Sequence, residues 1–222
     1  MKRIPGFFFV LFVMLSLLSE NLLFAASQAE VISLQGDDFE HIQFRKIKAN
    51  HYSNHDQVLQ IDVDSSASFL MNPFDAVKQV NKVSFEWRSK GTLQIKNAQH
   101  ELKKDGDDAV FKLGLLLETD DSLLNPFLPS WMKRVEQLLN FPSEYMIYLV
   151  ADAKHAPGRQ WLNPYNKRVT MISLSSVPDH KGWMKASYRF KQPVKVVAIW
   201  LMADGDNTQS SFTTHIKNIK IE

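Results

Sequence analysis

Apolar and polar residues alternate with a period of two along much of this chain. In 83–88 the apolar side chains take every second position and the polar ones the positions between, which is typical of a half-buried strand. Runs rich in β-branched or aromatic residues and bounded by Gly, Pro, Asp or Asn also predict strands. The predicted strands are 58–63, 83–88, 110–118, 145–151, 169–174, 184–190, 194–202 and 212–221, with weaker candidates at 32–34 and 42–47.

One segment follows a helical period instead. From Trp131 to Leu139 apolar residues recur at i, i+4, i+7 and i+8, the spacing of an amphipathic helix. Ser130 is a candidate N-cap, and prolines stand on both sides of the segment. The pattern predicts a helical insertion at about 129–141 that covers the open end of a sandwich. A mobile lid or a docking face for a partner is the alternative.

These elements predict an all-β fold. About ten strands with no helix between most of them favour antiparallel sheets over βαβ units. We therefore expect an antiparallel β-sandwich of the jelly-roll or galactose-binding-like type, with one short inserted helix. The chain shows no repeat, linker or low-complexity tract, so residues 28–222 are expected to form a single β-sandwich domain.

The N-terminus has the pattern of a secretory signal peptide. Lys2 and Arg3 precede an apolar run at 7–18, and small residues follow at 25–29. The alternative is an uncleaved membrane anchor, which needs about 20 apolar residues, and Glu20 interrupts any window of that length. Residues 1–27 are therefore expected to be a signal peptide. The protein is predicted to be periplasmic or secreted, with membrane contact only through an uncleaved signal segment.

Composition narrows the function classes. A formal net charge of +2 provides no basic face for nucleic acid, so no nucleic-acid partner is expected. The chain has no cysteine, which excludes a disulfide framework, cysteine-ligated zinc and thiol catalysis. A hydrophobic content of 45% is enough for a full core.

Two short acidic loops, 105–108 and 204–208, each lie next to a predicted strand. Carboxylate and amide oxygens close together are the ligands that calcium prefers. Asp-Gly is also a strong hairpin signal, so two ordinary turns are the alternative. If the sheets bring the loops together, the sequence predicts one cluster that could hold calcium as a cofactor. Its members are Asp107, Asp108, Asp204, Asp206 and Asn207.

Candidate ligand-binding residues lie in the irregular stretch 155–165. Arg159, Trp161 and Tyr165 combine a guanidinium with aromatic rings, a pattern that suits carbohydrate recognition. The alternative for Trp161 is that its side chain covers the edge of the core.

The polar face of 83–88 is a second candidate surface. Arg88 is a candidate ligand contact there, and Glu86 is a weak catalytic candidate that could act as an acid/base with an Asp from the loops. The alternative is a solvated face, because antiparallel sheets commonly leave one side wet.

No common catalytic motif is present. The chain lacks G-x-S-x-G, a phosphate-binding Gly-Lys loop, a dinucleotide fingerprint and H-E-x-x-H. We therefore expect an exported binding module that recognises a glycan or other cell-envelope component without catalysis. The alternatives are a glycan hydrolase or lyase that uses carboxylates at the sandwich rim, and an envelope assembly or scaffold protein with the predicted helix as its docking face.

Four short motifs resemble a known family. They are 66–68 (Ser-Ala-Ser), 85–88 (Phe-Glu-Trp-Arg), 106–108 (Gly-Asp-Asp) and 204–208 (Asp-Gly-Asp-Asn-Thr). In this order they resemble an exported bacterial family, domain of unknown function 3047, over roughly 58–222. The chain departs from that pattern at Lys112, Val150 and Asn218, where Arg, Trp and Asp are usual. The resemblance implies no established activity.

Overall fold

The computed structural model describes residues 29–35, 38–120 and 128–222. The predicted signal peptide at 1–27 lies outside these residues. Within the described ranges, no helix is long and apolar enough to cross a membrane.

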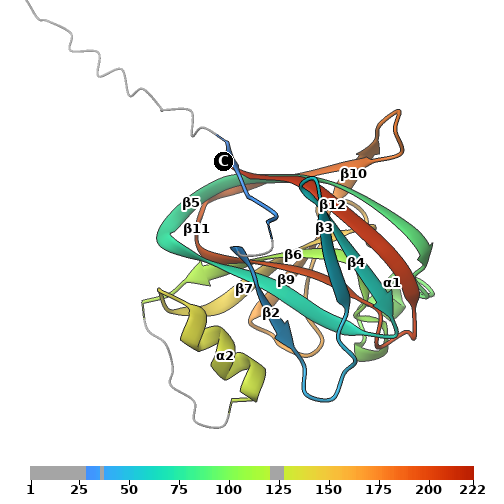
Figure 1. The fold of residues 1–222 in the computed structure, drawn as a ribbon, viewed down its shortest axis with the longest axis horizontal. Coiled ribbons are helices and arrows are strands. Elements are labelled where there is room, and N and C mark those ends of the chain that lie inside the picture. The colour runs from blue at the N-terminus through green and yellow to red at the C-terminus, as the bar shows by residue number, and fades with distance from the viewer. Residues whose placement is uncertain (1–28, 36–37, 121–127) are drawn as a thin grey trace, which may run out of the picture.

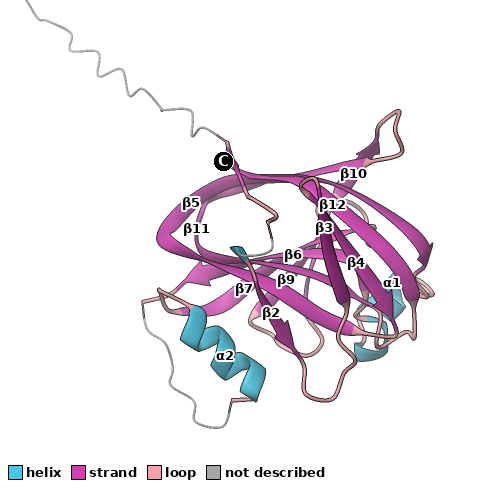
Figure 2. Cartoon of the chain, viewed as in Figure 1, coloured by secondary structure: helices cyan, strands magenta, loops and turns pink. Residues whose placement is uncertain are grey.

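Strands make up most of the described chain (Figure 2). The strands are β1 (Glu30–Val31), β2 (Glu40–Gln43), β3 (His51–His55), β4 (Val58–Asp64), β5 (Ala67–Thr92), β6 (Ala109–Glu118), β7 (Ser143–Ala151), β8 (Gln160–Leu162), β9 (Val169–Ser173), β10 (Ser175–Pro178), β11 (Met184–Asp204) and β12 (Ser211–Ile221). The helices are α1 (Ala98–Glu101), the 3-10 turn η2 (Lys104–Gly106) and α2 (Ser130–Leu138).

All strands of the described residues belong to one 12-stranded sheet, which folds over into two layers (Figure 1). The hydrogen-bonded order is β3-β4-β12-β5-β11-β6-β7-β9-β8. The long strands β5 and β11 bend and take part in both layers. Most neighbours run antiparallel, while β7 and β9 run parallel. The predicted all-β sandwich of jelly-roll type with one short inserted helix is confirmed, and α1 is a second, four-residue helix.

The sequence predicts β5 and β11 as shorter pieces. It predicts 83–88 instead of the 26-residue β5, and two strands instead of the 21-residue β11. Pro193 lies within a register shift between Arg189 and Val194, and Pro73 pairs with Ala198 at the next shift. Proline cannot donate a ladder hydrogen bond and is tolerated at such irregularities. The strands continue through positions that look like breaks in the sequence.

Two apolar cores lie on opposite faces of one layer. The first fills the space between the layers and contains Phe85, Phe111 and Ile199. The second covers the outer face of the layer that contains β6 and contains Phe69 and Trp200. Alternate residues of β11 therefore enter different cores, which explains why 196–203 is almost entirely apolar.

Helix α2 packs against the second core. The ring of Trp131 meets those of Phe44, Phe69 and Trp200 edge-on at 5.3, 6.1 and 6.1 Å. The helix was predicted to cover the open end of the sandwich, and instead it lies against the outer face of one layer (Figure 1). The cap prediction is also wrong: Ser130 is the first helical residue and Pro129 takes the N-cap position, with no side-chain cap bond within the described chain.

Candidate functional site

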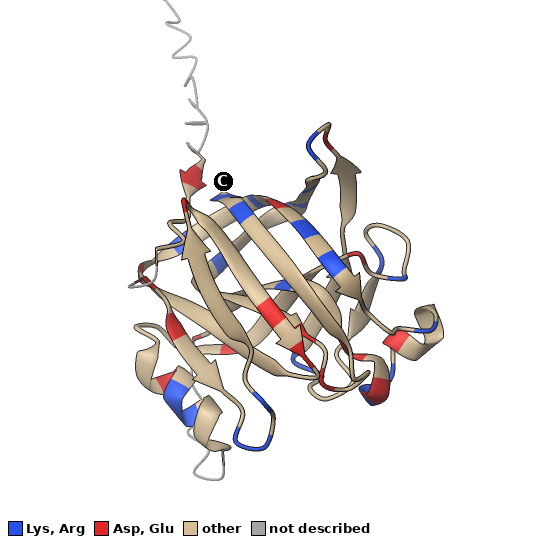
Figure 3. Cartoon of the chain, turned by 45° about the vertical axis from the view of Figure 1, so that its right-hand side comes forward, with Lys and Arg blue, Asp and Glu red and all other residues tan. Residues whose placement is uncertain are grey.

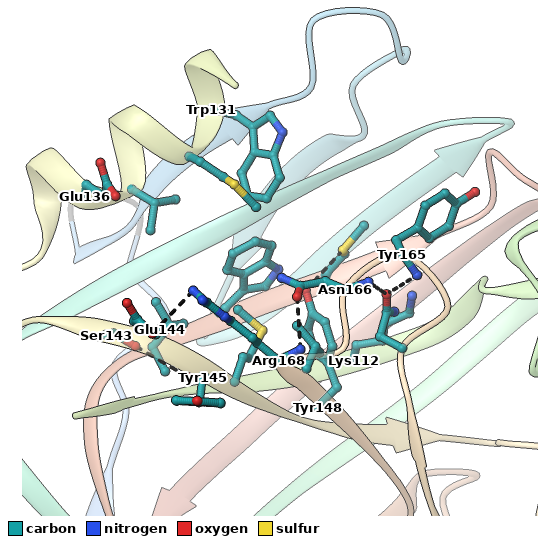
Figure 4. A pocket seen from close by; sticks show the side chains of 18 of the residues that line it. Lys112, Trp131, Glu136, Ser143, Glu144, Tyr145, Tyr148, Tyr165, Asn166 and Arg168 are labelled. Atoms are coloured by element: carbon teal, nitrogen blue, oxygen red, sulfur yellow. Dashed lines mark hydrogen bonds and ion pairs between the residues drawn. The ribbon is translucent and has the colours of Figure 1, made fainter. Parts of the chain in front are cut away.

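A large cleft opens on the outer face of the layer that contains β6, β7 and β11. Its volume is about 1310 Å³, more than the roughly 300–1,000 Å³ of most small-molecule sites. Figure 4 shows Trp131 of α2 on one side, Arg168 and Tyr148 facing it, and Tyr165 at one end. The cleft is therefore walled by α2 and by the 163–168 loop, with the sheet as its floor.

The floor of the cleft is aromatic. Trp200 stacks on Phe69 with ring centroids 3.4 Å apart and 9° between the planes. Tyr148 meets Trp200 edge-on at 5.9 Å. Trp200 is only 4% exposed, and its indole N–H has no hydrogen-bond partner within the described chain. A buried donor without a partner is costly, and here the aromatic packing of the floor offsets that cost.

The rim of the cleft carries exposed aromatic rings and an ion pair. Tyr145 is 50% exposed and Tyr165 is 55% exposed, and both line the cleft. Arg168 Nη1 lies 3.3 Å from Glu144 Oε2 on the wall opposite α2. The rim therefore offers flat rings and planar charged groups to a ligand.

The two acidic loops meet at the polar end of the cleft. The carboxylate of Asp108 accepts hydrogen bonds from the backbone and side chains of Asn207 and Thr208, at 2.5 to 3.3 Å. The Tyr165 hydroxyl lies 2.6 Å from Asn207 Oδ1. Asn163 Nδ2 donates to Asp107 Oδ2 at 2.7 Å. All five residues of the predicted acidic cluster therefore lie in one region.

A buried ammonium lies beneath this cluster. Lys112 Nζ is 2% exposed on its side chain and lies 3.0 Å from Asp204 Oδ2. It also donates to the Asp107 carbonyl oxygen at 2.7 Å. Burial alone would lower the pKa of Lys112, but Asp107 and Asp204 raise it above its ordinary value. Lys112 is therefore charged in the fold, and it neutralises part of the acidic cluster.

Asp204 has one unsatisfied oxygen. Its residue is 4% exposed, and Oδ1 has no hydrogen-bond partner within the described chain. Burial raises the pKa of Asp204 well above its ordinary value, while Lys112 lowers it. Burial likewise raises the pKa of Asp107. Both carboxyls therefore keep a proton to higher pH than a free aspartate does.

The glycines of both acidic loops are needed for close packing. A Cβ on Gly106 would overlap the carbonyl oxygen of His100, and one on Gly205 would lie 2.7 Å from Val63 Cγ1. Positive φ is not the reason, because neither glycine belongs to the positive-φ set. Asp-Gly therefore allows tight packing here as well as a turn.

We expect Gly106→Ala to destabilise the protein by about 2 kcal/mol, because the added methyl group displaces backbone. Gly182→Ala is the control: a Cβ at this position meets open space, and its φ is +77°, so only backbone strain of about 1 kcal/mol applies. Urea denaturation of both variants measures the difference. Equal losses would contradict the close-packing explanation.

The polar face of 83–88 is not brought to the cleft. Glu86 Oε2 lies 3.3 Å from Lys217 Nζ, and Glu86 Oε1 accepts from Asn218 Nδ2 at 3.1 Å. The guanidinium of Arg88 lies 4.6 Å from the Trp183 ring centroid. Neither Glu86 nor Arg88 lines the cleft in the described chain. Glu86 is therefore not placed to act with the carboxylates of the loops.

The structure places the three candidates from 155–165 in three different environments. Tyr165 lines the cleft, whereas Arg159 is exposed outside it. Trp161 is buried in the second core, with its ring 4.7 Å from that of His155. The alternative interpretation of Trp161, in which its side chain covers the core, is the correct one. Strand β8 pairs with β9, and the Trp161 indole is buried.

Sequence reasoning missed most of the cleft. Lys112, Tyr145, Tyr148, Trp200 and Arg168 belong to strands or their ends and have no motif around them. One signal was present: Lys112 is a single charge within the otherwise apolar run 109–117. A lysine at such a position is normally paired when it is buried.

The fold and cleft define a two-layer β-sandwich with an aromatic cleft on the outer face of one layer. A family model described as "Protein of unknown function (DUF3047)" matches residues 37–220, and the chain belongs to this family. No curated protein matches the chain.

Solved structures that resemble the chain include the following two. One is a loop-swap mutant of Necallimastix patriciarum Xyn11A, with 8% identity, coverage of 87% of this chain and 94% of that one, and a TM-score of 0.36. The other is the family 11 xylanase from Neocallimastix patriciarum, with 7% identity, coverage of 83% and 99%, and a TM-score of 0.31. At these scores the likeness carries no argument about function.

Proposed function

We propose that the protein is an exported, non-catalytic binding module that holds a glycan of several sugar units in the cleft. The observation that supports this most directly is the pair of exposed rings, Tyr145 and Tyr165, that line a cleft with an aromatic floor. A sugar ring has an apolar face for the aromatic side chains and hydroxyl groups that accept from an N–H. An acyl chain would match the aromatic rings but would offer no hydrogen bond to the polar groups of the rim, such as Arg168 and Glu144.

The size and charge of the cleft agree with an extended, uncharged ligand. The volume of about 1310 Å³ accommodates more than one ring. Arg168 is engaged by Glu144, and Lys112 is engaged by Asp204. Basic and acidic residues are interspersed over the ribbon visible in Figure 3. These pairings favour hydroxyl recognition over recognition of a polyanion.

The proposal is tested by titrating a panel of soluble envelope and plant-type oligosaccharides into the mature protein by calorimetry. We expect Tyr145→Ala to weaken binding of the best oligosaccharide about tenfold, or ~1.4 kcal/mol, because an exposed ring that stacks on a sugar is removed. Val177→Ala is the control, because Val177 is 63% exposed on β10 and does not line the cleft.

Three outcomes contradict the proposal. The folded protein could bind none of the oligosaccharides, or Val177→Ala could weaken binding as much as Tyr145→Ala. Release of new reducing ends during incubation would identify a hydrolase instead, with the carboxylates of the cleft as the groups to substitute first.

A further inference from the structure

We propose that the polar end of the cleft binds one divalent cation of the calcium type, held by Asp204 and Asp206 with Asp108 beside them. One oxygen from each of these three carboxylates lies within 4.8 Å of the others. Calcium–oxygen distances are about 2.3–2.6 Å, so two oxygens on opposite sides of one ion lie up to about 5 Å apart. The spacing of the three carboxylates therefore suits one shared ion.

The second observation is the free oxygen of Asp204. Asp204 Oδ2 is paired with Lys112 at 3.0 Å, but Oδ1 is buried and has no partner within the described chain. The residue is buried on the same side of β11 as the cleft that it lines. A buried carboxylate oxygen without a donor is unfavourable, and a cation between Asp204 and Asp206 removes that cost.

The charges around the site also favour a bound cation. Asp107, Asp108, Asp204 and Asp206 lie close together at this end of the cleft, and Lys112 is the ammonium buried against them. These four carboxyl groups share one ammonium, and when ionised at this separation they repel one another, which favours a cation among them. A divalent ion between Asp204 and Asp206 offsets this repulsion, and Asp108, which already accepts four hydrogen bonds from the 207–208 turn, stays beside the ion.

The ligand chemistry selects a hard cation. The groups that converge are carboxylate oxygens of Asp108, Asp204 and Asp206, while the amide oxygen of Asn207 is bonded to the Tyr165 hydroxyl. Oxygen donors suit calcium, magnesium or manganese, whereas zinc and copper prefer nitrogen and sulfur. Calcium tolerates irregular coordination better than magnesium, and three carboxylates from two loops form an irregular set.

The position gives the ion two roles. It joins the turn after β11 to the loop before β6, which already touch through Asp108 and Asn207. It also lies at the cleft wall, where vicinal hydroxyls of a sugar could complete its coordination. The first role is independent of the proposed function, and the second rests on it.

The test uses calcium chloride alone. Calcium is titrated by calorimetry into chelator-treated mature protein, and thermal unfolding is followed with 1 mM calcium or with excess chelator. We expect one ion per chain and a higher unfolding midpoint with calcium, because an ion that binds only the folded state stabilises it. Asp206→Asn should weaken calcium binding at least tenfold.

Asp105→Asn is the matched control. Asp105 stands in the neighbouring loop, its side chain is 72% exposed, and it lies 3.5 Å from His100 Nε2, outside the proposed ligand set. This variant should bind calcium as the wild type does. Circular dichroism checks the fold of both variants, and terbium luminescence excited through tyrosine provides a second readout near Tyr165.

Absence of calcium heat and of a midpoint shift in the wild type would overturn the inference. Equal loss of calcium binding in Asp105→Asn and Asp206→Asn would also overturn it, because the effect would then be one of general charge. Oligosaccharide binding measured with excess chelator is a separate readout. Binding that persists there leaves the proposed function intact even when calcium does not bind.

Discussion

Replacing Lys112 with methionine is expected to lower the free energy of unfolding by about 4 kcal/mol, the range observed when one partner of a buried ion pair is removed. Methionine fills nearly the same volume, so the loss comes from charge. Without the ammonium, Asp204 keeps a buried carboxylate whose remaining neighbours include Asp107. Urea denaturation in the presence of a chelator measures the effect without a contribution from bound metal.

Two further variants test this explanation. Lys112→Met combined with Asp204→Asn should recover part of the lost stability, because the uncompensated carboxylate is removed with its partner. Lys195→Met removes an exposed lysine that lies 2.8 Å from Glu118 and should leave the unfolding midpoint unchanged. A double variant that is less stable by the sum of both single losses would show that the two residues do not interact.

Glu101→Gln is expected to change how stability depends on pH. Burial raises the pKa of the Glu101 carboxyl from an ordinary value of 4.5 to about 7. Between these pH values the unfolded chain releases the proton while the folded protein keeps it, so the free energy of unfolding falls as the pH rises. One pKa unit is worth about 1.4 kcal/mol, so the fall is up to about 3 kcal/mol between pH 4.5 and 7.

The glutamine variant cannot ionise at this position. It keeps an acceptor for the Lys154 backbone N–H, which lies 2.9 Å from Glu101 Oε2. We expect the variant to be more stable than the wild type at pH 8 and similar to it at pH 4. Glu136→Gln on the exposed face of α2 is the control, and it should follow the wild-type curve. A difference between wild type and Glu101→Gln that stays constant from pH 4 to 8 would contradict the buried-carboxyl explanation.

The two residues with these large expected effects belong to no sequence motif that marks a site. Lys112 is one charge in an apolar strand, and Glu101 belongs to a four-residue helix between two loops. What makes them important is burial, and burial depends on residues far along the chain. Asp204 stands 92 positions from Lys112, and Lys154 stands 53 positions from Glu101.

The acidic loops show how much of the site local sequence patterns can predict. The residue types and the strands beside them were enough to select Asp107, Asp108, Asp204, Asp206 and Asn207, because Asp-Gly marks a turn and turns lie at strand ends. The contact between the loops depends on the sheet. Strands β6 and β11 are neighbours, and Asp204 pairs with Ala109. The hydrogen bond from Asn207 to Asp108 therefore joins two residues that are 99 positions apart in the chain.

The sequence by itself determined the fold class and most strand positions, because the period of apolar residues reports which local backbone can bury one face. It also determined which residues form the inserted helix, but not the face of the sheet on which the helix packs. Only the tertiary structure decided that Pro73 and Pro193 lie inside continuous strands, that Trp161 is buried while Tyr165 lines a cleft, and that Glu86 faces away from the acidic loops. Side-chain surroundings in a β-sandwich come from non-local strand pairing, which no local pattern encodes.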